Sequence, residues 1–205
     1  MKWSEVFDPD LEPGEVICAQ IPAIHQARLE QFRQFSSTSL LFSIYFSDTD
    51  ERYTLLLGLE ESHGESGEMI DFPQATARGK ASDWQRAMEL TSRLVEPADE
   101  QIERYEGRVE LTSAIKDGFE RFDGVLEIEI TELPDGPPLI FEVILNDYTD
   151  PPRAPRASLT VTWSLLDDLA HGRIDPVAAA KKVTLRGAMG LAIDLGGFFA
   201  DEFDL

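Results

Sequence analysis

The chain has 205 residues, with 39 acidic and 18 basic side chains and a formal net charge of −21 at pH 7. This charge argues against nucleic acid and anionic membranes as partners, because both need clustered lysine and arginine. The hydrophobic fraction of 42% supports a packed core, no apolar run is long enough for a transmembrane segment, and the acidic N-terminus lacks a signal-peptide core. We therefore expect a globular, cytoplasmic protein.

The N-terminal half begins with a leader and a helix, followed by a β-hairpin. Proline and glycine punctuate residues 1–20, and Pro22 can begin a helix that runs to about Phe35. Residues 40–46 and 53–59 carry alternating sets of apolar side chains on either side of a polar turn. This alternation predicts two antiparallel strands.

A loop, a third strand and a helical region follow. We interpret the glycine-containing stretch 60–73 as a loop and 74–81 as a weakly patterned strand. Ser82 is expected to cap a helix. The apolar residues of this helix share its inner side, because their spacing follows the helical period: Trp84, Ala87, Met88 and Leu94. Glu96-Pro97 predicts the start of another short helix, and Gly107 follows a possible strand.

The second half repeats this plan. Apolar residues at helical spacing from Leu111 to Phe122 predict a helix, and residues 125–130 and 139–145 predict a second hairpin. Hairpin connections are too short for a crossover helix, so they favour antiparallel neighbours. Strands that alternate apolar and charged residues have one solvated face. The pattern predicts an α+β fold in which helices cover one face of a mostly antiparallel sheet.

The C-terminal part continues with strand and helix signals. Residues 157–163 alternate as a strand, and Ser164 stands where a helix N-cap belongs. Gly172 can end that helix in a left-handed turn. Asp175-Pro176 predicts a second helix, with Asp as cap and Pro at the first helical position. A return to strand is expected over 183–186.

The chain then enters Gly187-Ala188-Met189-Gly190-Leu191-Ala192, which predicts one more short apolar helix. This ordered set, with the step Gly172-Arg173-Ile174-Asp175-Pro176 before it, resembles the C-terminal part of the sterol carrier protein type 2 family. The resemblance is strongest over residues 120–200. It implies the family's fold and the binding of lipids or other apolar ligands in a tunnel. Some members of the family serve only as structural or dimerising appendages of enzymes.

The two halves match each other in order and spacing, so that Phe42 falls on Leu126, for example. We interpret this as an internal duplication. A degenerate copy with its leader would span 1–111, and a sterol- or lipid-binding domain would span 112–205. The alternative is an accidental match, which any α+β chain of this length can give.

No pattern indicates catalysis. Ser62 and His63 are adjacent, which does not place their side chains within hydrogen-bond reach, and no phosphate-binding or dinucleotide motif is present. A metal site at His63 with neighbouring glutamates is disfavoured, because a flexible loop with one histidine is a poor cage. Cys18 is expected to be a buried, inert thiol. We expect no catalytic residue, no metal and no cofactor.

The resemblance therefore carries the functional prediction: non-catalytic binding or transfer of a lipid or other apolar small molecule. The candidates for the tunnel wall are Trp163, Leu166, Leu169, Val177, Met189, Leu191, Ala192 and Leu195. The alternative is a structural, interaction or dimerisation module that has lost ligand binding. The small residues Ala178–Ala180 stand where the family usually has larger ones, and they are compatible with both ligand binding and an interaction module. A homodimer or an enzyme partner is compatible with either.

Overall fold

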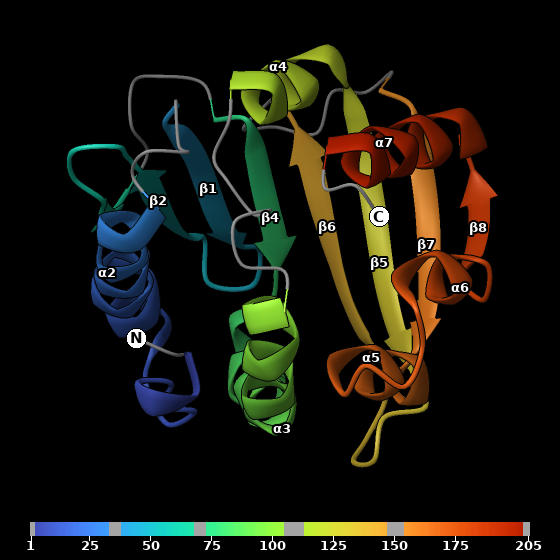
Figure 1. Ribbon diagram of the computed structural model, residues 1–205, viewed down its shortest axis with the longest axis horizontal. Coiled ribbons are helices and arrows are strands. Elements are labelled where there is room, and N and C mark those ends of the chain that lie inside the picture. The colour runs from blue at the N-terminus through green and yellow to red at the C-terminus, as the bar shows by residue number, and fades with distance from the viewer. Residues whose placement is uncertain (1–2, 33–37, 68–72, 105–112, 147–153, 203–205) are drawn as a thin grey trace.

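The computed structural model describes residues 3–32, 38–67, 73–104, 113–146 and 154–202. Within these ranges, eight strands form one sheet in the order β3-β2-β1-β4-β6-β5-β7-β8. Figure 1 shows this sheet behind the helices. The strands are β1 (Leu40–Phe46), β2 (Glu51–Leu57), β3 (His63–Ser66), β4 (Ala75–Gly79), β5 (Gly124–Thr131), β6 (Leu139–Leu145), β7 (Arg156–Thr162) and β8 (Thr184–Gly187).

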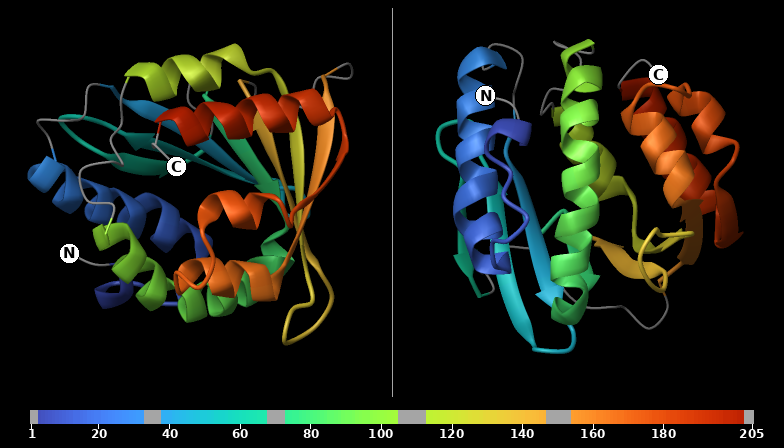
Figure 2. Two further views of the ribbon diagram at one scale, coloured as in Figure 1. Left: turned by 45° about the vertical axis from the view of Figure 1, so that its right-hand side comes forward. Right: turned by 90° about the horizontal axis from the view of Figure 1, so that it is seen from below.

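Helices form a layer over one face of the sheet (Figure 2). They are η1 (Trp3–Glu5), α1 (Pro13–Glu15), the π-helix η2 (Val16–Gln20), α2 (Ile21–Phe32), η3 (Ala81–Asp83), α3 (Trp84–Arg104), α4 (Ser113–Arg121), α5 (Trp163–Ala170), α6 (Pro176–Ala180) and α7 (Met189–Glu202). Among the helices of the described ranges, none combines the length and the apolar character that crossing a bilayer requires.

Each half of the chain contributes four strands, and three of the four have the same arrangement in both halves. β1 and β2 form an antiparallel hairpin with Phe42 opposite Leu55, and β4 returns parallel to β1 on its other side. In the second half β5 and β6 form an antiparallel hairpin with Leu126 opposite Val143, and β7 lies parallel to β5. β4 pairs antiparallel with β6, so the halves share one sheet. The boundary predicted at 111/112 lies outside the described residues.

The predicted mostly antiparallel sheet with helices is therefore observed, with two parallel pairings that local patterns did not predict. The alternation along each strand separates the two faces of the sheet. On the helix side, Leu126 and Leu145 belong to a buried cluster, and Phe42 stacks edge-on against Phe119 of α4, with ring centroids 6.0 Å apart. The opposite face carries polar side chains such as Glu127.

Two predictions in the first half were wrong, and one segment without a predicted element proved to be part of the core. That segment is the leader, in which Ile17 of η2 is only 2% exposed. Residues 60–73 are not all loop, because β3 pairs with β2 there. Pro97 does not begin a helix but lies inside α3. The helix continues beyond Pro97, where the buried Asp99 accepts a hydrogen bond from the backbone N–H of Ser4 at 2.7 Å. The strand predicted before Gly107 would extend into residues outside the described ranges.

Most predictions made from local sequence patterns in the second half were correct. Asp175 caps α6 by accepting hydrogen bonds from the backbone N–H groups of Val177 and Ala178, and Gly172 adopts the expected left-handed conformation with φ 64°. The N-cap of α5 was predicted at Ser164 but is Thr162, whose hydroxyl accepts from Leu165 N at 3.3 Å. The helix therefore begins directly at the end of β7.

Candidate binding cavity

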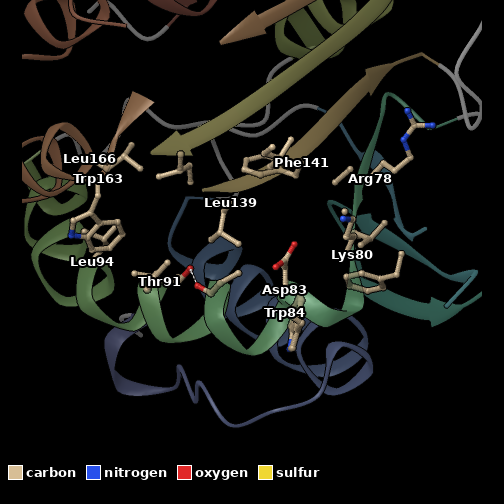
Figure 3. A pocket seen from close by; sticks show the side chains of 18 residues that line it. Arg78, Lys80, Asp83, Trp84, Thr91, Leu94, Leu139, Phe141, Trp163 and Leu166 are labelled. Carbon is tan, nitrogen blue, oxygen red and sulfur yellow. Dashed lines mark hydrogen bonds between the residues drawn. The ribbon is translucent and has the colours of Figure 1, made fainter. Parts of the chain in front are cut away.

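A cavity of about 360 Å³ lies between the sheet and the two helices α3 and α5 (Figure 3). Its walls come from both halves of the chain: from β1 and β4 in the first and from β5 and β6 in the second. Most of the lining side chains are apolar. They include Trp84 and Leu94 of α3, Leu139 and Phe141 of β6, and Trp163 and Leu166 of α5.

Small residues keep this space open on two of its walls. β4 presents Ala77 and Gly79 to the cavity, and a Cβ built on Gly79 would meet only Phe141 Cβ, at 4.0 Å. α3 presents Ala87 and Thr91, four residues apart on one face. Larger side chains at these positions would fill the volume that the helix and the strand enclose.

Trp84 is held in place at one end of the cavity. Its indole N–H donates to the backbone carbonyl of Leu11 at 2.9 Å, and its ring lies edge-on to Phe46 with centroids 5.7 Å apart. Buried indoles usually need such a partner for their N–H group. This anchoring fixes one wall before any ligand is present.

Charged side chains gather at the same end of the cavity. Figure 3 shows Asp83 and Lys80 near one another, with Arg78 farther along β4. Asp83 forms an ion pair with Arg86 at 3.2 Å, and Arg78 forms one with Glu142. The cavity is therefore apolar over most of its wall and charged at one rim.

The eight predicted wall residues fall in different places. Trp163 and Leu166 line the cavity. Leu169 packs in the neighbouring cluster around Leu165. Three residues of α7 pack on the sheet, in the cluster that α4 also contacts: Leu191, Ala192 and Leu195. The remaining two, Val177 and Met189, are 43% and 51% exposed. The hollow lies beside α5 rather than beneath α7, because Leu195 is buried against the sheet.

Sequence reasoning missed the contribution of the first half to this cavity. The inner stripe of α3 was predicted correctly, since Trp84, Ala87 and Leu94 all face the cavity and Met88 is buried. The small residues Ala77 and Gly79 of β4 could have indicated an open space beside this strand. The position of α3 beside α5, however, depends on the pairing of β4 with β6, which no local pattern shows.

A serine–histidine contact occurs away from the cavity. His25 Nδ1 lies 2.7 Å from Ser62 Oγ, which also accepts from Gly58 N at 3.1 Å. Burial lowers the pKa of His25, so the ring is neutral at pH 7. Within the described ranges no carboxylate orients this ring, and the contact ties the loop after β2 to α2. It does not form a catalytic triad.

Neither metal chemistry nor comparison with known proteins adds a function. Among the residues that the structure describes, no three His, Cys, Asp or Glu side chains are grouped as a metal site requires. No protein-family model matches the chain, and no curated protein matches it. The cavity is thus the feature on which a functional argument can rest.

Proposed function

We propose that the protein binds, without catalysis, a lipid or another apolar molecule in the cavity between α3, α5 and the sheet. One observation carries this proposal: a mainly apolar space of about 360 Å³ between the sheet and two helices. Ligand pockets typically span ~300–1,000 Å³ and are mainly apolar. Each methylene buried there contributes ~0.8 kcal/mol, so a chain of several carbons needs no catalytic or ionic partner to be held.

The resemblance to the sterol carrier protein type 2 family supports an apolar ligand, since that family binds apolar ligands, and two of the wall residues that it implies, Trp163 and Leu166, line this cavity. We also propose that the two halves arose by duplication. The matching trios β2-β1-β4 and β6-β5-β7 support this, with Phe42 and Leu126 in equivalent positions. In this account the cavity forms where the two copies meet, at β4 and β6. The cytoplasmic location stays a prediction.

The proposal is tested with the neutral probe N-phenyl-1-naphthylamine, whose fluorescence rises in apolar sites. The wild type should bind it with saturation. Ala87→Phe places a phenyl ring in the cavity and should weaken binding about tenfold or more. Ala178→Phe makes the same change on the exposed side of α6, outside the cavity, and should leave binding unchanged. Equal affinities for all three proteins would refute the site.

A second candidate is an interaction or dimerisation module. One observation favours it: α6 and α7 expose the apolar side chains of Val177, Met189 and Ile193, which are 43%, 51% and 56% exposed. Exposed apolar patches often mark contacts with other proteins. Sedimentation analysis over a wide concentration range distinguishes the two, because a self-associating module shows a mass that rises with concentration, whereas a monomeric carrier does not.

A further inference from the structure

The charged rim of the cavity continues into a second pocket of about 270 Å³. The two spaces share the lining residues Arg78, Gly79, Lys80, Asp83, Ile140 and Phe141. The second pocket adds Glu127 and Glu142, which belong to the sheet face that the helices leave uncovered. The apolar cavity therefore opens towards a polar surface at this end.

The opening lies where two strands part. The pairing of β4 with β6 ends at Arg78 opposite Glu142. Gly79 and Phe141 come next along these strands, and the space at Gly79 is open, since a Cβ added there would lie 4.0 Å from Phe141 Cβ. A ligand in the cavity can thus keep its apolar part under α3 and place its other end at the strand ends.

The charges at the opening are not equivalent, because most of them already have partners. Glu142 pairs with Arg78 and, at 3.2 Å, with Arg156. Asp83 pairs with Arg86.

Two further carboxylates nearby, Asp48 and Glu127, already accept hydrogen bonds from other residues. Asp48 accepts the backbone N–H groups of Ala81 and Ser82, which lowers its pKa and keeps it ionised. Glu127 lines only the outer pocket, where it accepts from Ser158 at 3.3 Å.

Lys80 is the exception. Its side chain is exposed and lines both spaces, and it forms no ion pair with any residue in the described parts of the chain. Its ammonium group is therefore the cation that an incoming charged group meets at the junction between the cavity and the outer pocket.

We infer that the ligand is an amphipathic molecule with a single negatively charged end, with its apolar chain in the cavity and its anionic group beside Lys80. This inference rests on the proposed function and adds the chemical class of the ligand. The net charge of −21 does not exclude such a ligand, because the ammonium group of Lys80 lines the junction where the anionic group would lie.

The test compares three ligands with the same chain: dodecanoate, dodecanol and dodecylamine. Their binding to the full chain is measured by calorimetry at low ionic strength, where an exposed ion pair is least screened. Dodecanoate should bind about three- to fivefold more tightly than dodecanol, the range expected for an exposed lysine–carboxylate pair. Dodecylamine should bind more weakly than dodecanol.

Three variants assign this preference to Lys80. Lys80→Met should abolish the preference, so that dodecanoate and dodecanol bind this variant with equal affinity, and Lys80→Arg should retain it. Lys182→Met is the matched control: it removes one exposed positive charge outside both pockets, and should keep the preference. Failure of all three ligands to bind would refute the proposed function itself. If the wild type binds dodecanoate and dodecanol with equal affinity, or if the preference for dodecanoate survives in Lys80→Met, only the anionic class of the ligand is refuted.

Discussion

Replacing Leu195 by alanine tests whether α7 is packed on the sheet or forms the wall of a hollow. Leu195 is 8% exposed and belongs to a buried cluster with Leu126 and Leu145. On the same helix, Ile193 is 56% exposed. The two positions therefore offer a large buried side chain and a large exposed one in the same secondary structure.

The expected cost follows from this burial. Covering a leucine side chain contributes roughly 1.5–3 kcal/mol, and the void left behind adds a further penalty, so buried Leu→Ala changes cost about 2–5 kcal/mol. Because Leu195 contacts several core residues, we expect Leu195→Ala to lower the free energy of unfolding by about 3 kcal/mol. Ile193→Ala should change it by less than about 0.5 kcal/mol, as an exposed substitution that also favours the helix.

Urea unfolding followed by circular dichroism measures both values. Probe binding is measured alongside, and Leu195→Ala should not weaken it, since the side chain does not line the cavity. Costs below about 1 kcal/mol for both variants would show that α7 is loosely held. A selective loss of probe binding in Leu195→Ala would move the ligand beneath α7 and refute its placement between α3, α5 and the sheet.

Three further predictions concern stability. Gly196→Ala should stabilise the protein by about 0.5–1 kcal/mol in urea unfolding, because this position lies inside α7 with nothing near its Cβ; a loss would show that the helix is not formed there. Gly64→Ala should destabilise it by about 1–3 kcal/mol, since the new Cβ would lie 2.3 Å from the backbone oxygen of Ile17; an unchanged midpoint would contradict this close approach. Burial holds the pKa of His25 below the ordinary 6.5, so the unfolded chain takes up its proton first as the pH falls, and stability is lost below about pH 6.5. In thermal melts, His25→Gln, which can still bond Ser62, should lose less stability than the wild type between about pH 7.5 and 5.5, and identical losses would refute the reasoning.

The hairpins and helix caps could be predicted because their signals are local. The Asp175 cap needs only its own side chain and the next three residues. The alternation in residues 40–46 and 139–145 identifies strands without knowledge of their partners. The cap at Thr162 was missed by two residues, because helix boundaries shift easily with the strand that precedes them.

The cavity could be predicted only in part because it depends on distant pairings. Of the eight wall residues that the family resemblance implied, Trp163 and Leu166 line this cavity. Ala77 and Gly79 reach the same space because β4 crosses over to lie beside β1 and then pairs with β6. Such parallel and long-range contacts leave no periodic signal in the sequence, so the meeting of the two halves required the structure.

The most direct test of the cavity uses the three tryptophans of the chain. Trp84 and Trp163 line the cavity, whereas Trp3 lies in η1 and does not. Fluorotryptophan labelling gives one fluorine NMR signal for each, assigned by single Trp→Phe variants. On titration with dodecanol, the signals of Trp163 and Trp84 should shift with saturation while that of Trp3 stays fixed. A saturable shift confined to Trp3, or no shift at any of the three, would contradict ligand binding between α3, α5 and the sheet.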